Sequence, residues 1–451
     1  MGSGSGPDVW ALALQPDGKV VIAGQCVGAI NADFCAVRYN GDGTLDSTFG
    51  TGGKVITPVG NGVDQALALA LQPDGRLVLV GFCAGAFCAV RYDPNGSLDV
   101  TFGIGGKAIT QIGSGSDAAA HAVAMQPDGN FVLAGYCMGS TTTAFCALRY
   151  DASGNLDLSF GTGGLVVVSV GRGDRPEAVA LQPDGKLVLA GTCGGAVDED
   201  FCAVRLNGNG TLDNTFGTGG KVITPVGSSF DVGRALVLQP DGKILIAGRC
   251  SNGSNSEVCA VRYNTNGAVD ETFGASGAVF TAVGQGYYSD AVSVALQPDG
   301  KIVFAVSCLG AANADICAVR YNGDGTLDST FGTGGKVITP VANSLALARA
   351  VVLQPDGKVV IGGVCASGQT SSYCAVRYDG GPFGYRICSL DIDGDNRVLA
   401  TTDSLIHARI ALGITGNAVV SGITFPPNAK RNTWPLIRDY LVRQCGMSLL
   451  Q

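Results

Sequence analysis

A motif of the form LQPDG or MQPDG recurs along the chain and constrains the fold more than any other feature of the sequence. Its glutamine stands at Gln15, Gln72, Gln126, Gln182, Gln239, Gln297 and Gln354. These seven copies follow one another at a period of about 57 residues. Units this short cannot bury their apolar faces alone, so neighbouring copies must stack. The sequence therefore predicts one large structure built from seven similar units.

Each full copy has four runs of strand length separated by turn signals. In the second copy these runs are residues 66–71, 76–82, 88–92 and 107–112. The first connection reads QPDG, in which Pro73 sets the φ of the second turn position and Gly75 can take a positive φ, so we expect a tight hairpin. Radial stacking of four-stranded antiparallel units gives an all-β fold, a seven-bladed β-propeller.

Most of the 16 cysteines fall into close pairs, one pair in each copy. The pairs are Cys26/Cys35, Cys83/Cys88, Cys137/Cys146, Cys193/Cys202, Cys250/Cys259, Cys308/Cys317 and Cys365/Cys374. Regular pairing predicts disulfides formed in an oxidising compartment, and hence a secreted, extracellular or cell-surface protein. Zinc is the alternative, but the chain has only two histidines, and structural zinc sites usually use short Cys spacings or histidine.

Charge and hydropathy argue against a nucleic-acid partner and against a membrane span. A net charge of -8 and a pI of about 4.8 disfavour nucleic acid, which requires a clustered basic surface. The longest apolar stretches are well short of the roughly 20 residues that span a bilayer, so we expect no membrane span. We expect residues 1–7 to be a tag-like or flexible N-terminus and not a targeting segment.

The repeat, read as LQPDGKVVIAG followed by AVRYNGDGTLDSTFGTGG, resembles the delta-60 repeat family of bacterial secreted proteins. The resemblance covers roughly residues 8–380. It implies an extracellular β-propeller-like protein and offers no established activity. The cysteine pairs depart from the usual pattern of that family. We therefore expect a propeller over residues 8–380 and a separate module over residues 381–451.

The last copy lacks a fourth strand of its own, because the repeat pattern stops after Tyr378. We expect residues 384–390 to supply the missing edge strand. A strand donated by a neighbouring subunit is the alternative.

An arginine recurs in the third strand and an aspartate in the turn that follows it. The arginines are Arg38, Arg91, Arg149, Arg205, Arg262, Arg320 and Arg377, and the aspartates are Asp46, Asp99, Asp157, Asp213, Asp270 and Asp328. Their regularity favours a structural ion pair in each copy over an anion-binding ring.

Function is better sought where the copies differ. Five residues before each repeated glutamine, the series reads Trp10, Leu67, His121, Glu177, Arg234, Val292 and Arg349. We expect these positions to lie toward one mouth of the central channel, where propellers commonly bind partners. Binding there would involve Trp10, His121, Glu177, Arg234 and Arg349. Relaxed packing at a strand end is the alternative explanation.

The sequence after Cys388 resembles half of a dockerin or EF-hand unit. Asp391, Asp393 and Asp395 alternate, the carbonyl of Arg397 fits the backbone ligand position, and Asp403 stands just after the closing position, so we expect a calcium site. Helices are predicted over residues 403–412 and 434–444, with Cys388 bridged to Cys445. An Asp-rich turn that caps a helix is the alternative.

Taken together, these patterns predict an extracellular structural, adhesive or self-assembling surface protein. Its partners would be copies of itself or another surface protein. The alternative is a carbohydrate-binding or hydrolytic propeller that uses one channel mouth. The sequence contains no nucleophile elbow, zinc-protease motif or P-loop, so we expect no enzyme.

Overall fold

The computed structural model describes residues 8–380 apart from ten short gaps, at 28–30, 114–116, 139–141, 195–197, 252, 286–287, 310–312, 342–344, 355–356 and 368–369. Beyond residue 380 it describes residues 406, 419–425, 433 and 437. The chain divides into two units, Met1–Asp379 and Gly380–Gln451. Within the described residues, no helix has the length and apolar character needed to cross a bilayer.

The first unit consists of β-strands, which take four successive places in each repeat. The first strands are β1 (Asp8–Leu14), β5 (Asp64–Leu71), β9 (Ala118–Met125), β13 (Arg172–Leu181), β17 (Val232–Leu238), β21 (Ser289–Leu296) and β25 (Leu345–Leu353). The second strands are β2 (Val20–Val27), β6 (Leu77–Cys83), β10 (Phe131–Met138), β14 (Leu187–Gly194), β18 (Ile244–Ser251), β22 (Ile302–Leu309) and β26 (Val359–Ser367). The third strands are β3 (Ala32–Tyr39), β7 (Ala86–Tyr92), β11 (Thr143–Tyr150), β15 (Glu199–Leu206), β19 (Ser256–Tyr263), β23 (Ala314–Tyr321) and β27 (Thr370–Tyr378). The fourth strands are β4 (Lys54–Thr57), β8 (Lys107–Thr110), β12 (Leu165–Val168), β16 (Lys221–Thr224), β20 (Ala278–Thr281) and β24 (Lys336–Thr339).

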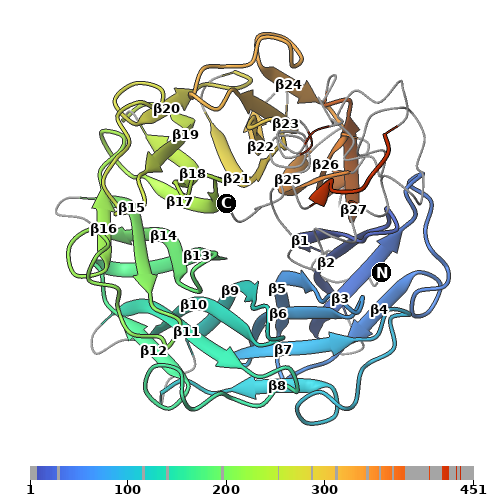
Figure 1. Ribbon diagram of the computed structural model, residues 1–451. Coiled ribbons are helices and arrows are strands. Elements are labelled where there is room, and N and C mark those ends of the chain that lie inside the picture. Colours follow the sequence, from blue (N-terminus) through green and yellow to red (C-terminus); the bar gives the residue numbers. More distant parts are fainter. Residues whose placement is uncertain are drawn as a thin grey trace. The chain divides into compact units, whose positions relative to one another are not determined.

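These strands form blades arranged around a central axis (Figure 1). Neighbouring strands of a blade pair antiparallel in sequence order, and the first strand of each repeat lies innermost. The prediction of an all-β propeller built from four-stranded antiparallel sheets is confirmed. The last repeat contributes three described strands, β25, β26 and β27, and β25 also makes one parallel bridge to β23. The fourth strand predicted at residues 384–390 lies outside the described residues.

The predicted QPDG hairpin is confirmed at the turn between the first and second strands. In the second repeat the amide of Gln72 donates to the carbonyl of Arg76 at 2.8 Å, and Gly75 N–H donates back to Gln72 at 2.9 Å. Gly75 has a φ of 85°, a conformation that side-chain-bearing residues rarely adopt. This turn fixes the register of the two strands, because a two-strand hairpin takes its register from its turn.

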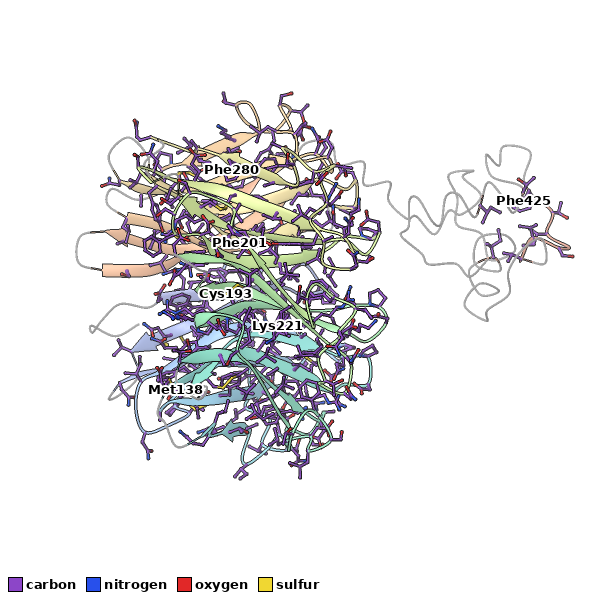
Figure 2. All side chains as sticks on the ribbon, turned by 90° about the vertical axis from the view of Figure 1, so that its left-hand side faces the viewer. Met138, Cys193, Phe201, Lys221, Phe280 and Phe425 are labelled. Carbon is purple, nitrogen blue, oxygen red and sulfur yellow. A yellow bond between two sulfur atoms is a disulfide. The ribbon has the colours of Figure 1, made fainter. Side chains whose placement is uncertain are left out.

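The hydrophobic core lies between adjacent blades. One cluster joins Val78 and Phe87 of the second blade to Phe131 and Leu133 of the third, and all four side chains are fully buried. Figure 2 shows side chains along the sheets of the first unit. Burying a large apolar side chain contributes roughly 2 kcal/mol, so each blade is stabilised chiefly by its neighbours. This explains why the repeats need one another.

The repeated arginine and aspartate form a structural ion pair, as predicted. In six copies the arginine Nε donates to the aspartate Oδ2 at 2.7 Å. Arg205 also lies over the ring of Phe216 at 4.6 Å and donates to the carbonyl of Thr265 in the next blade. In the last repeat Arg377 donates to the carbonyl of Gly41 in the first blade at 2.7 Å. Six of the seven arginines in this way donate to a backbone carbonyl of the next blade around the ring.

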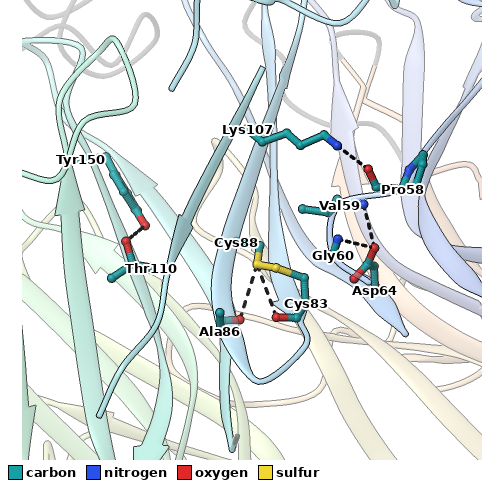
Figure 3. The surroundings of a disulfide bond; sticks show 10 residues. All are labelled: Pro58, Val59, Gly60, Asp64, Cys83, Ala86, Cys88, Lys107, Thr110 and Tyr150. Carbon is teal, nitrogen blue, oxygen red and sulfur yellow. Dashed lines mark hydrogen bonds between the residues drawn. A yellow bond between two sulfur atoms is a disulfide. The ribbon is translucent and has the colours of Figure 1, made fainter. Parts of the chain in front are cut away.

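Six of the predicted cysteine pairs are disulfides that join the second and third strands of a blade. They are Cys83–Cys88, Cys137–Cys146, Cys193–Cys202, Cys250–Cys259, Cys308–Cys317 and Cys365–Cys374, with Cα atoms 5.7–6.1 Å apart. Figure 3 shows the first of them, Cys83–Cys88. Asp64 lies beside it and accepts hydrogen bonds from the backbone N–H groups of Val59 and Gly60, in the segment that links the first two blades.

The first pair along the chain, Cys26/Cys35, differs from the prediction. Cys26 and Cys35 are buried and are not bonded to each other. The Sγ of Cys35 instead lies 3.0 Å from the hydroxyl of Tyr373, which comes from β27 of the last repeat. That hydroxyl also donates to the carbonyl of Gln25 at 3.1 Å. The first pair thus sits where the last blade meets the first, in a setting that no other pair has among the described residues.

The predicted calcium module falls almost wholly outside the described residues. These include none of Asp391, Asp393, Asp395, Arg397 and Asp403. Cys388 and Cys445 likewise lie outside the described part of the chain. Of the second unit, Ile406, Val419 and Ile437 are buried, and Ile406 and Ile437 have helical backbone. These single positions do not define the predicted helices, which stay predictions.

Candidate functional site

Every inner strand carries a β-bulge at the same repeat position. In the second blade Ala66 pairs with Gly81 and Ala68 with Val80, so Leu67 is the unpaired extra residue. The bulged residues of the seven repeats are Trp10, Leu67, His121, Glu177, Arg234, Val292 and Arg349. They are the same seven residues that the sequence singled out as variable. A bulge releases its residue from the ladder and redirects the side chain, so the repeat provides one adjustable position per blade.

A glycine in the second strand makes room for the bulge. A Cβ atom on Gly81 would lie 1.9 Å from the carbonyl oxygen of Gln65, so the backbone would have to shift to accept it. The equivalent glycines of the third and fourth blades, Gly135 and Gly191, meet the same obstacle. The sixth blade has Val306 at this position and still forms the bulge.

All seven bulged residues line one cavity of about 590 Å³. The bulges lie near the beginnings of the inner strands, which pair with the cysteine ends of the second strands, as in Asp64 with Cys83. The cavity therefore occupies the channel mouth on the side of the cysteine loops, which we call the cysteine-loop mouth.

Two further variable positions line the cavity, and sequence reasoning missed both. The residue two before the bulge contributes Gln65, Ala119, Arg175, Asp290 and Leu347. The residue before the first cysteine of each pair contributes Phe82, Tyr136 and Ser307. Both positions change chemical type from copy to copy, which is the same signal that identified the bulge. They are recognised as one site only through the register that places two strands side by side.

Polar and charged side chains form a chain of contacts across four blades at this mouth. The Nδ1 of His121 lies 2.7 Å from Oε2 of Glu177, and Nη1 of Arg234 lies 3.4 Å from Oε1 of the same carboxylate. Nε of Arg234 lies 3.5 Å from Oδ2 of Asp290. Each contact joins adjacent blades, so the bulged residues hold one another in place.

Electrostatics keep Glu177 ionised. Burial acts to raise the pKa of Glu177, but the hydrogen bond and attraction of His121 and the charge of Arg234 outweigh it, so its pKa lies below the ordinary value. Both of its oxygens already have partners. Glu177 therefore acts as a fixed counter-ion, and the arrangement does not present it as a free general acid.

The first and last blades meet at the same mouth. Nη2 of Arg349 donates to both carboxylate oxygens of Asp8, at 3.2 and 3.3 Å, and the guanidinium lies 4.3 Å from the ring centre of Trp10. Arg349 thus links the two ends of the propeller and covers one face of Trp10.

Aromatic rings add a second kind of surface to the cavity. Phe82, Tyr136 and Tyr288 join Trp10 among the lining residues. Burial raises the pKa of Tyr136 and of Tyr288, with neighbouring Asp117 and Asp290 acting in the same direction. Both phenols therefore remain neutral hydrogen-bonding groups at ordinary pH. Among the described residues, no three His, Cys, Asp or Glu side chains lie close enough together to hold a metal ion.

A family model matches six segments of the chain. It is described as "Domain of unknown function (DUF5122) beta-propeller", and it matches residues 15–49, 72–102, 126–160, 182–216, 239–273 and 297–331. None of the curated proteins compared with the chain matches it. The match supports a propeller repeat; the delta-60 name and the dockerin resemblance stay predictions.

Solved structures are similar to the chain at low sequence identity. The polysaccharide lyase Uly1 has a TM-score of 0.50 and 12% identity over 84% of this chain and 92% of its own. Sqt1 from Chaetomium thermophilum has a TM-score of 0.43 and 13% identity over 84% of each chain. At such identities a likeness concerns the fold alone. The chain is therefore a β-propeller repeat protein, six of whose copies match this family of unknown function.

Proposed function

We propose that the protein is a secreted propeller, braced by disulfides, that acts as an adhesive by binding carbohydrate at the cysteine-loop mouth. One observation carries the proposal: the positions that differ between otherwise uniform repeats converge on one cavity of about 590 Å³. A cavity of this size accommodates a few sugar units, and polar groups beside aromatic faces suit a ligand that is hydroxylated and partly apolar.

The disulfides support an extracellular location. Six bonded pairs are typical of proteins made in an oxidising compartment. Each closes only a short loop, so each adds about 2 to 3 kcal/mol in the chain-entropy account. The test compares two versions of the protein fused to a fluorescent marker, one expressed with a secretion signal and one retained in the cytosol. The fluorescence of the two versions would show whether only the exported form folds fully.

A glycan array tests the binding itself. The full chain should bind a defined set of saccharides, and the double variant Phe82→Ala/Tyr136→Ala should lose most of that signal because two ring faces are removed. Ile104→Ala is the matched control, since Ile104 is 91% exposed and does not line the cavity. An array without signal, or an equal loss in the control, would contradict the proposal.

Self-assembly is a second candidate function, favoured by the outer side of the last blade. Ala375 of β27 is exposed. The equivalent Ala89 and Ala147 are fully buried, and each pairs with a residue of a fourth strand that lies beside it in the sheet. Exposed strand edges pair readily with other strands. Light scattering of purified protein that shows only monomers at high concentration would exclude this candidate.

We also propose that the segment from Asp391 to Asp403 binds calcium, as its alternating carboxylates predict. Calorimetric titration of the full chain should show one calcium site that the double variant Asp391→Asn/Asp393→Asn abolishes. Heat of binding that is unchanged in this variant would place calcium elsewhere.

A further inference from the structure

We infer that the cysteine-loop mouth selects acidic saccharides, those bearing carboxylate or sulfate groups, over neutral ones. This inference rests on the proposed function, because it names the ligand class of the same site.

The cavity presents its cations and hides the anions that hold them. The side chain of Arg234 is 34% exposed, whereas its partners Glu177 and Asp290 are 16% and 3% exposed. A ligand that enters the mouth therefore meets the guanidinium of Arg234 before it meets either carboxylate. The buried carboxylates orient the guanidinium, which lowers the entropy cost of binding an anion.

Arg175 adds a cation that is free to bind a ligand. It lines the same cavity, its side chain is exposed, and among the described residues no carboxylate lies within 4 Å of its guanidinium. The planar guanidinium matches a carboxylate or sulfate with two parallel hydrogen bonds. An exposed, unpaired arginine beside a fixed one can hold an acidic group between them.

Aromatic faces beside these cations favour a sugar over a simple anion. The rings of Phe82 and Tyr136 come from the second and third blades, and the ring of Tyr288 lines the same cavity as Arg175 and Arg234. The apolar face of a pyranose ring packs on such surfaces, while the acidic substituent reaches the arginines.

The positive mouth is a local feature, since the whole chain carries a net charge of -8. General attraction to anions is therefore excluded as the source of selectivity. Arginines and carboxylates both line the cavity, but Glu177 and Asp290 are more buried than Arg234, so the charge that the mouth exposes to a ligand is mainly positive and attracts an anion. Added salt should weaken binding for the same reason.

Titration of the full chain with two matched probes tests the inference. The probes are a tetramer of galacturonate and a tetramer of neutral galactose, in buffer containing a chelator so that calcium bridging plays no part. The acidic probe should bind about tenfold more tightly, which is the effect expected of one or two charge-assisted hydrogen bonds.

Two arginine variants complete the experiment. Arg175→Gln should weaken the acidic probe about tenfold and leave the neutral probe unchanged. Arg172→Gln is the control, because Arg172 is exposed on the same strand and does not line the cavity. Equal affinity for the two probes, or an equal loss in both variants, overturns the inference and leaves the proposed function standing. Failure of both probes, together with an empty glycan array, overturns both.

Discussion

At the scale of single residues, the repeat separates positions that build the fold from positions that can change. Gly81 is of the first kind, because the carbonyl of Gln65 occupies the space that a Cβ would take. Leu67 is of the second kind, because a bulged residue leaves the strand ladder. In six of the seven repeats this glycine makes room for the bulge, so that side chains of several kinds face one cavity.

The variant Gly81→Ala tests this role. A Cβ only 1.9 Å from a carbonyl oxygen must push the bulge aside, so the free energy of unfolding should fall by about 1 to 3 kcal/mol. Gly62→Ala is the control, since no atom lies within 4 Å of the Cβ position there. Urea denaturation followed by circular dichroism measures both. Equal stability of the two variants would show that the bulge does not depend on the glycine.

Sequence reasoning found Trp10, His121 and Glu177 because they interrupt a uniform strand. It did not find the bulge, Arg175 or Tyr136. The bulge depends on the hydrogen-bond register between the first and second strands of a repeat. The cavity combines positions on these two strands from several repeats, which are far apart in the sequence. The disulfide partners were predictable because strand ends beside a short loop must lie together. The contact between Cys35 and Tyr373 was not, since it spans nearly the whole propeller.

At the scale of elements, the repeated arginine ties one blade to the next, and in most copies it is buried. Arg205 has its own aspartate partner, an aromatic ring below it and a carbonyl of the following blade. The ring comes from Phe216 in the turn that carries Asp213, so one turn supplies both contacts. The regular length of the turn follows from this pairing.

Replacing Arg205 by methionine should therefore destabilise the propeller strongly. Asp213 would remain buried, with Lys186 3.7 Å away as its remaining cation among the described residues, and a buried carboxylate that loses its partner costs about 3 kcal/mol. Arg377→Met is the control: Arg377 is exposed, so its loss should cost about 1 kcal/mol or less. Thermal unfolding of both variants measures the difference. A smaller effect at Arg205 than at Arg377 would contradict the assigned role.

Acid should weaken the same elements. Hydrogen bonds from Thr48, followed by those from Lys19 and Arg38, outweigh burial and lower the pKa of Asp46 below its ordinary value. Because the pKa of Asp46 is lower in the folded state than in the unfolded state, where it is about 3.9, ionised Asp46 stabilises the fold fully at a pH above that unfolded-state pKa. This contribution is lost as the pH falls through the folded-state pKa. Stability in urea should thus be nearly flat from pH 7 to 5 and decline below about pH 4, with a shallower decline in Asp46→Asn. An identical pH profile in that variant would refute this source of acid sensitivity.

At the scale of the whole molecule, closure of the ring depends on contacts between the last blade and the first. Arg349 binds Asp8 and stacks on Trp10, while Tyr373 contacts Cys35 and Gln25. The first cysteine pair lies at this junction and is unbonded. The first blade thus lacks the disulfide that joins the second and third strands of the other blades, and Tyr373 of the last blade contacts its cysteine instead.

Counting thiols tests that difference. Protein denatured without reductant should react at Cys26 and Cys35, and the variant Cys26→Ser/Cys35→Ser should react with two fewer equivalents of thiol reagent. Peptide mapping by mass spectrometry would locate the labelled cysteines. Equal reactivity in the two proteins would show that Cys26 and Cys35 are joined in solution, as the sequence alone predicts.

A crystal structure of the full chain with the galacturonate tetramer tests the central claim most directly. We predict sugar density at the cysteine-loop mouth, with a carboxylate within hydrogen-bonding distance of Arg175 or Arg234 and a ring face against Phe82 or Tyr136. Density for the saccharide at any other surface, with the mouth free of it, would contradict the account.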